Sequence, residues 1–204
     1  MEDKEHYYDK LLNIHTVGEQ KIFNRSSHYH RYEPTPYSSL ELLFHEYPLK
    51  ESDSIVDFGC GKGSLNFFIH YMFNSSVTGI EMNKTFYQEA VNNLNSYRKK
   101  RKTPHEKILF SRCLAEEYPI ASANNIFYFF NPFSIQIFMK VINHILLSVE
   151  ETPRDITLIL YFASDDYIFY LENDTPFQLS KEIRLPGLYE HVPYERFLIY
   201  KLSY

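Results

Sequence analysis

Short apolar runs alternate with longer amphipathic stretches along most of the chain. Ser54–Phe58, Ile126–Phe130 and Ile156–Phe162 have the length of strands, and their nearly continuous apolar character is typical of strands buried on both faces. Ile135–Val149 instead repeats its apolar residues at spacings of three or four, which predicts a helix with one buried face. The pattern as a whole predicts helices over 4–14, 36–44, 66–73, 84–97, 135–149 and 165–173, and strands over 54–58, 76–81, 107–110, 126–130, 156–162, 177–185 and 196–202.

This alternation predicts an α/β fold with a Rossmann-like, mostly parallel seven-stranded sheet and helices on both faces. The last two strands have little helix between them, so we expect a C-terminal antiparallel hairpin at one end of the sheet. No linker divides the chain, and 204 residues suit one domain. We therefore expect a single domain over 1–204, with an N-terminal extension at 1–31 and a core at 32–204.

Composition and charge exclude several classes of protein. Hydrophobic residues make up 44% of the chain, which is too much for a disordered protein. The net charge of −5 argues against a protein that coats nucleic acid. The charged N-terminus lacks the apolar core of a signal peptide, and no apolar run approaches the roughly 20 residues needed to cross a bilayer. We expect a soluble, cytoplasmic protein without membrane contact, whose cysteines Cys60 and Cys113 form no disulfide framework.

Glycine is scarce and clustered. The chain has six glycines, and Gly59, Gly61 and Gly63 fall within five residues, directly after a predicted strand and before a predicted helix. Glycine lets the backbone turn tightly and lets a ligand approach amide groups. The N-terminus of the following helix favours an anionic group. Glu81 ends the next strand, where an acidic side chain can accept hydrogen bonds from ribose hydroxyls.

Two ligand classes use this layout. A dinucleotide fold has the pattern G-x-G-x-x-G, whereas this chain has G-x-G-x-G, with Ser64 in place of the last glycine and Asp57 two positions before the first. Val56–Gly63 together with Gly79–Glu81 resembles the class I S-adenosylmethionine-dependent methyltransferases. The resemblance implies S-adenosylmethionine as cofactor. It covers residues 32 to about 203, although only 55–81 carry specific motifs.

The resemblance also implies which residues hold the cofactor. The glycine turn would pass along its amino acid and ribose parts, Glu81 would hold the ribose, and Met82 would pack on the adenine. The segment Tyr32–Tyr37 is similar to a Thr-Pro element that some members place at the cofactor's carboxylate, although Thr35 could equally be an ordinary helix cap. The implied cofactor contacts are Tyr32, Thr35, Asp57, Phe58, Gly59, Cys60, Gly61, Gly63, Glu81, Met82 and Asn131.

One further motif follows the fourth predicted strand. Asn131-Pro132-Phe133 is similar to the Asn/Asp-Pro-Pro-aromatic motif of amino-group methyltransferases, with one proline missing. By this resemblance Asn131 would orient a planar amino group and Phe133 would stack on it, so that Asn131, Pro132 and Phe133 are the catalytic candidates. The alternative is that Asn-Pro merely ends a strand and starts a helix.

Several questions stay open in the sequence. The methyl acceptor is a small molecule, a protein or RNA, and the adenine amino group is held by backbone groups or by Glu116. A silent S-adenosylmethionine-binding module and an NAD(P)-dependent oxidoreductase are the alternatives to an enzyme of this family. The basic run 98–102 fits a solvated helix end better than a phosphate site. His28 and His30 lack the further ligands that zinc needs, so we expect no metal.

Overall fold

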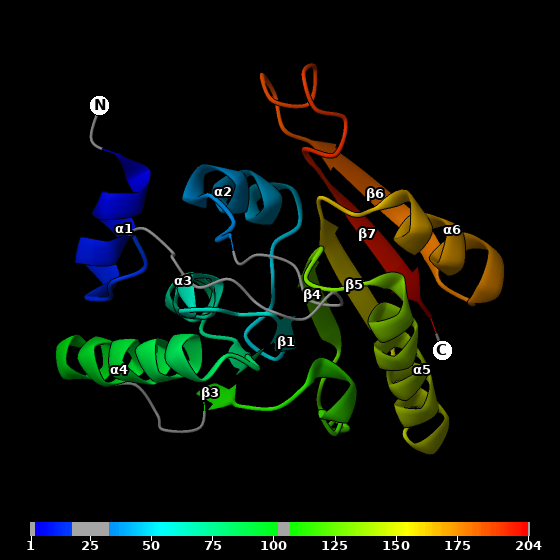
Figure 1. The fold of residues 1–204 in the computed structure, drawn as a ribbon, viewed down its shortest axis with the longest axis horizontal. Helices are drawn as coiled ribbons and strands as arrows, with labels where there is room; N and C mark the ends of the chain where they lie inside the picture. The colour runs from blue at the N-terminus through cyan, green and yellow to red at the C-terminus, as the bar shows by residue number, and fades with distance from the viewer. Residues whose placement is uncertain (1–2, 18–32, 102–106, 204) are drawn as a thin grey trace.

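The structure, a computed structural model, describes residues 3–17, 33–101 and 107–203. A seven-stranded sheet runs through it in the order β3-β2-β1-β4-β5-β7-β6 (Figure 1). Its strands are β1 (Ser54–Phe58), β2 (Ser76–Ile80), β3 (Ile108–Ser111), β4 (Ile126–Phe130), β5 (Ile156–Tyr161), β6 (Gln178–Arg184) and β7 (Arg196–Leu202). The helices are α1 (Lys4–Leu12), α2 (Tyr37–Glu46), α3 (Ser64–Phe73), α4 (Lys84–Lys100), α5 (Ile135–Glu151) and α6 (Asp165–Asp174), with a 3-10 turn η1 at Ala115–Glu117.

The direction of the strands confirms the predicted fold class. The pairs β3·β2, β2·β1, β1·β4 and β4·β5 are parallel. Helices connect β1 to β2, β2 to β3 and β4 to β5, and the 3-10 turn η1 lies between β3 and β4. β7 runs antiparallel to both β5 and β6, which makes the C-terminal hairpin. The order reverses at β1 and β4, so the loops after these two strands border the crevice in which open α/β sheets bind ligands.

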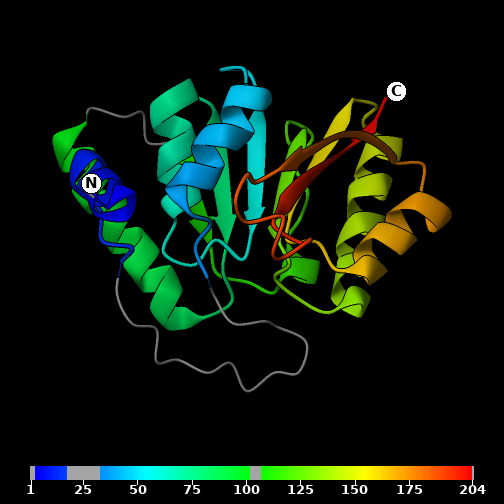
Figure 2. The ribbon, with the colours of Figure 1, turned by 90° about the horizontal axis from the view of Figure 1, so that it is seen from above.

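Two layers of helices cover the sheet (Figures 1 and 2). One core cluster combines residues of α1, α2, α3 and α4 with one face of the sheet, and the other combines α5, α6 and η1 with the opposite face. Alternation along β4 divides its aromatic residues between the layers: Tyr128 and Phe130 face α2, and Phe127 and Phe129 face α5. Within the described residues, no helix is both long enough and apolar enough to cross a membrane.

Helix α1, which the sequence assigns to an extension, packs into the first of these clusters. The Tyr8 ring stacks on Tyr37 of α2 with centroids 4.4 Å apart, and Leu12 and Ile14 are almost completely buried. Buried Asp9 accepts hydrogen bonds from the Thr16 backbone N–H and hydroxyl, both at 2.7 Å, which fix the chain leaving the helix. The helix therefore shares its core with the sheet.

We expect Leu12→Ala to lower the free energy of unfolding by about 2–5 kcal/mol, because the leucine is 0% exposed and its removal leaves a cavity. The matched control is Leu147→Ala on α5, where the leucine is 55% exposed and the expected change is within about 0.5 kcal/mol. Urea unfolding followed by circular dichroism measures both. Equal stability of the two variants would show that α1 is not part of the cooperative core.

Candidate functional site

The candidate site lies at the carboxyl edge of the parallel strands. The registers pair Phe58 with both Ile80 and Phe129, so β1, β2 and β4 end side by side. The glycine turn, Glu81 and Asn131 directly follow these strand ends. The fold thus brings together the three features that the sequence singles out.

The glycine turn is tied to the end of β2 through its own backbone. The Gly59 and Cys60 N–H groups both donate to the Ile80 carbonyl oxygen, at 2.9 and 3.1 Å. The Gly61 N–H donates to Glu81 Oε2 at 3.0 Å, and the Gly63 N–H donates to the Cys60 carbonyl at 2.9 Å. These four amide groups therefore hold the turn in shape. Because the loop amides are engaged within the protein, the amides that we expect to face a ligand are those of the first turn of α3, whose N-cap is Gly63.

Glycine is required in this turn for its backbone conformation and for space. Gly59, Gly61 and Gly63 have φ values of 86°, 54° and 86°, in the left-handed region. A Cβ on Gly63 would lie 2.6 Å from the Phe110 ring, and one on Gly59 would lie 3.0 Å from Pro132 Cβ. Gly79 on β2 is as tightly enclosed, since a Cβ there would lie 2.6 Å from Cys60 Sγ. The turn is thus packed between β2 and the loop after β4.

Glu81 is 7% exposed and holds two loops at once. Its two carboxylate oxygens accept from the Gly61 N–H at 3.0 Å and from the Asn83 N–H at 2.7 Å. Burial raises the pKa of this carboxyl group, while the backbone bonds from Asn83, Gly61 and Met82 lower it. Asn83 in turn caps α4, because its side-chain oxygen accepts from the Thr85 N–H at 2.9 Å. Glu81 therefore fixes the turn after β1 relative to the start of α4.

Asp57, the acidic residue before the turn, is buried beside Glu81. With the Asn66 amide oriented so that its nitrogen faces Asp57, the Asp57 side chain accepts a hydrogen bond from that amide at 3.1 Å, and the Asn66 oxygen accepts from the Gly79 N–H at 3.3 Å. Burial and the nearby charge of Glu81 raise the pKa of Asp57 to about 8. Asp57 thus connects β1, α3 and β2. Asn66, which the motif analysis missed, is signalled in the sequence only as a polar residue within an apolar helix.

The Thr-Pro element reaches the same edge from α2. Thr35 is buried, and its hydroxyl lies 2.6 Å from the Tyr128 hydroxyl on β4. Pro36, and not Thr35, is the N-cap of α2. Tyr128 pairs with Asp57 in the sheet, and the sequence contains no motif that marks it. Tyr32 lies outside the described residues.

The loop after β4 separates the three catalytic candidates. Asn131 is partly exposed and has a left-handed φ of 38°, and Pro132 packs against Gly59. Phe133 is 1% exposed and packs in the α5 layer, where its ring makes an edge contact with Phe129 at 6.2 Å. Its carbonyl accepts a hydrogen bond from Tyr167. Stacking of Phe133 on a substrate stays a prediction and would require this ring to leave the core.

The other residues predicted to contact the cofactor lie around the turn, and they differ in how far they are buried. Phe58 is buried and stacks on Phe129 at 5.2 Å, so its side chain belongs to the core. Cys60 is buried, and burial raises the pKa of its thiol well above the usual range, which disfavours a reactive thiolate. Met82 is partly exposed next to Glu81, and Glu116 is partly exposed in η1. Their expected adenine contacts stay predictions.

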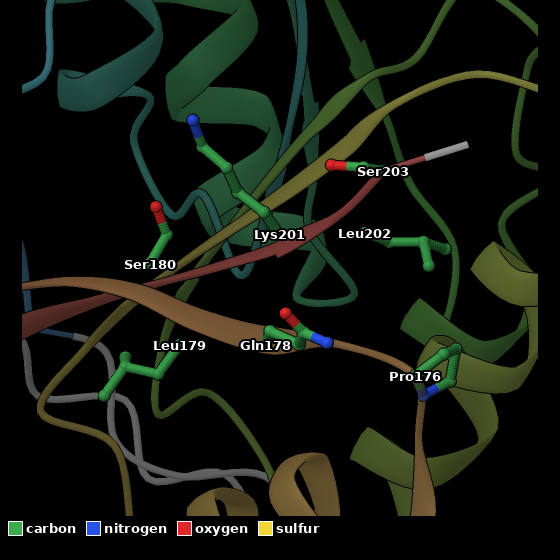
Figure 3. Close-up of a pocket in the computed structure, with 7 residues that line it drawn as sticks. All are labelled: Pro176, Gln178, Leu179, Ser180, Lys201, Leu202 and Ser203. Carbon is green, nitrogen blue, oxygen red and sulfur yellow. The ribbon is translucent and has the colours of Figure 1, made fainter.

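The basic run and a surface pocket lie at the opposite edge of the sheet, where the parallel strands begin. The basic run follows α4 away from the site over about 25 Å; within it Lys100 donates to the Lys10 carbonyl at 2.9 Å and Arg101 covers the Tyr71 ring at 4.1 Å. A hollow on the β6–β7 hairpin also lies there, because Lys201 pairs with Thr157 near the start of β5 (Figure 3). Its walls are Pro176, Gln178, Leu179, Ser180, Lys201, Leu202 and Ser203. Neither feature borders the glycine turn.

Metal ligation has no geometric support in the part of the chain that the structure describes. There, no three His, Cys, Asp or Glu side chains are grouped so that they could hold a metal ion. His28 and His30 lie outside the described residues.

Comparison with solved structures identifies the fold. An RNA methyltransferase from Salinibacter ruber in complex with S-adenosyl-L-homocysteine aligns with a TM-score of 0.54 and 13% identity over 84% of this chain and 93% of that one. A putative RNA methyltransferase from Pyrococcus horikoshii aligns with a TM-score of 0.59 and 18% identity, over 100% and 98%. A geranyl diphosphate C-methyltransferase from Streptomyces coelicolor, also with S-adenosyl-L-homocysteine, gives 0.53 and 11%, over 81% and 73%.

These similarities show that the chain has the fold of class I S-adenosylmethionine-dependent methyltransferases, as the motifs predict. Neither a protein-family model nor a curated protein matches the amino-acid sequence. The likeness to known proteins is therefore one of structure.

Asp57→Asn tests the buried carboxyl group. The raised pKa means that the folded protein keeps a proton that the unfolded chain releases above the ordinary value of 3.8, so Asp57 makes the wild type lose stability as pH rises from about 4 to about 8. An asparagine can accept the same bond from Asn66 without this proton. We expect the melting temperature of the variant, relative to wild type, to increase across that window and then level off.

Differential scanning fluorimetry at a series of pH values measures this difference. Glu150→Gln, at an exposed position of α5, controls for loss of one carboxylate. A difference between Asp57→Asn and wild type that is constant with pH would contradict the raised pKa.

Proposed function

We propose that this protein is a methyltransferase that uses S-adenosylmethionine. The observation that carries the proposal is the joining of the glycine turn to Glu81 at the edge where β1, β2 and β4 end, in a chain with the methyltransferase fold. Two of the structural neighbours carry S-adenosyl-L-homocysteine, which supports the same cofactor here.

The residues present fit this cofactor. Gly59 is exposed at the turn with no Cβ between the backbone and Pro132. Each Glu81 oxygen accepts a backbone hydrogen bond, and the carboxylate keeps lone-pair capacity for a ribose hydroxyl. Glu81 would hold the ribose, the first turn of α3 the amino acid part, and Met82 the adenine. The glycine spacing and the position of Asp57 favour this cofactor over NAD(P).

Asn131 is the residue that we propose to orient the acceptor. It follows β4 at the switch point of the sheet and is partly exposed as a residue, and an amide oxygen accepts hydrogen bonds from an amino group. The Asn131 oxygen is itself buried, so the side chain would turn toward a bound acceptor. S-adenosylmethionine, if bound, would supply an electrophilic sulfonium methyl group and leave as S-adenosyl-L-homocysteine, and the acceptor oriented by Asn131 would give up one proton to water. Positioning by this chain's residues provides most of the rate gain.

The fold leaves the acceptor open. Neighbours at similar TM-scores are named for RNA and for geranyl diphosphate, so their names do not single out one acceptor class. A nitrogen acceptor rests on the Asn131-Pro132 sequence and is the finer part of the proposal.

Glu81→Ala should lower the affinity for S-adenosyl-L-homocysteine by about 10- to 100-fold, because a charged hydrogen-bond acceptor is lost from a buried site. Isothermal titration calorimetry measures this, with the exposed Glu117→Ala as control and thermal melting to verify folding. NAD+ titrated in parallel should give no heat of binding. Binding of NAD+ in place of S-adenosyl-L-homocysteine would contradict the proposed cofactor.

Asn131→Gly should leave S-adenosyl-L-homocysteine affinity unchanged and lower methyl transfer roughly 100-fold, because it removes the orienting side chain while glycine tolerates the φ of 38°. Transfer is measured with S-adenosylmethionine carrying a radiolabelled methyl group and with extract fractions sorted into small molecules, protein and RNA. Unchanged transfer would remove Asn131 from catalysis. Cofactor binding with no transfer to any fraction would indicate a silent binding module.

A further inference from the structure

A cluster of aromatic side chains lies next to Asn131 on the α2 side of the sheet. Phe130 precedes Asn131, and its partner in the register is Tyr161, so Asn131 and Phe162 follow neighbouring strand ends. The Phe162 ring lies 6.4 Å from the Phe130 ring and 5.6 Å from that of Tyr194 in the β6–β7 connection. We call Phe130, Phe162 and Tyr194 the aromatic wall.

Phe162 is held in an unfavourable backbone conformation to form this wall. Its φ is 53°, a left-handed value that is rare for a bulky side chain, and its N–H reaches the Arg196 carbonyl at 3.4 Å. All three wall residues are partly exposed, in contrast to the buried ring of Phe133. The wall therefore offers next to Asn131 the accessible aromatic surface that the sequence motif assigns to Phe133.

Carboxylates surround the aromatic wall. Tyr194 donates to Asp165 Oδ2 at 3.2 Å, and Tyr161, behind the wall, donates to Glu195. The pKa of Tyr161 is raised by burial, by Glu195 and also by the charge of Glu33, so a third carboxylate lies nearby.

The two arginines at this end of the hairpin share one carboxylate, which leaves one net positive charge among the three groups. Arg184 and Arg196 both contact Glu182, at 3.1 and 2.7 Å. Against this one positive charge stand the three carboxylates Asp165, Glu195 and Glu33, so these described charged groups together are negative, whereas the basic run lies at the other edge of the sheet.

We propose that the aromatic wall binds the methyl acceptor and that the acceptor is a small amine that carries an aromatic ring. The flat ring would stack on Phe162 and Phe130 and bring its nitrogen to Asn131, and the acidic surroundings favour an uncharged or cationic molecule over a polyanion. A cationic amine would first release its ammonium proton to water, so that the free lone pair accepts the methyl group. The inference rests on the proposed function and adds the class of its acceptor.

The absence of tryptophan from the sequence provides a direct test. In Phe162→Trp the new indole is the one source of tryptophan fluorescence, and a ring that stacks on it should quench the emission. Four probes separate ring from charge: phenethylamine, cyclohexylethylamine, phenylpropionate and a hexa-adenylate RNA. We expect phenethylamine to quench at concentrations at least about tenfold lower than the other three.

Equal quenching by cyclohexylethylamine would overturn the requirement for an aromatic ring. Tighter binding of phenylpropionate or of the hexa-adenylate would overturn the predicted charge, and the latter would favour RNA. Thermal melting verifies that the variant folds.

A second variant keeps the inference testable if the tryptophan is not tolerated. Phe162→Leu should lower radiolabelled methyl transfer to the small-molecule extract fraction about tenfold while S-adenosyl-L-homocysteine affinity stays unchanged. Phe169→Leu, at a ring 65% exposed on α6, is the matched control and should transfer as wild type does. Normal transfer by Phe162→Leu would overturn this inference alone, whereas a wild-type protein that binds no S-adenosyl-L-homocysteine would overturn the proposed function.

Discussion

The contact between the turn after β1 and the end of β2 organises the whole site. Two amide groups of the turn share the Ile80 carbonyl, and a third reaches Glu81. This arrangement needs a backbone that doubles back within five residues, and left-handed glycines make that turn without steric cost. Because the turn also leads into α3 and packs on Pro132, its shape determines where the helix, β2 and the loop after β4 meet.

The same contact has an electrostatic cost. It places the Glu81 and Asp57 carboxyl groups close together in a buried position, and burial raises the pKa values of both. Asn66 and the backbone N–H groups offset part of this cost by hydrogen bonding to the carboxyl groups. A fold that served only to pack a sheet would gain stability from apolar residues here, so the retained carboxyl pair favours a binding role for this edge.

The sequence predicts the elements and the glycine turn well and the orientation of single side chains poorly. Apolar runs and helical spacing mark every strand and helix of the sheet core, because burial on one or two faces leaves a periodic pattern. The direction of the side chains after β4 depends on Asn131. Strand alternation places Phe129 and Phe130 in opposite layers, and the left-handed backbone of Asn131 then changes the direction of the chain. Phe133 consequently enters the α5 layer, which no motif spacing could reveal.

Asn131 and Phe162, which directly follow β4 and β5, both have left-handed backbone conformations. Each costs up to about 1–2 kcal/mol relative to an ordinary strand end, less for asparagine than for phenylalanine. Asn131 and Phe162 nevertheless follow neighbouring strand ends, since Phe130 and Tyr161 are partners in the register. Packing of Phe162 against Phe130 and Tyr194 offsets part of the cost, but a glycine at either position would avoid it. The strain at these two positions therefore favours a role for the Asn131 and Phe162 side chains at the proposed acceptor site.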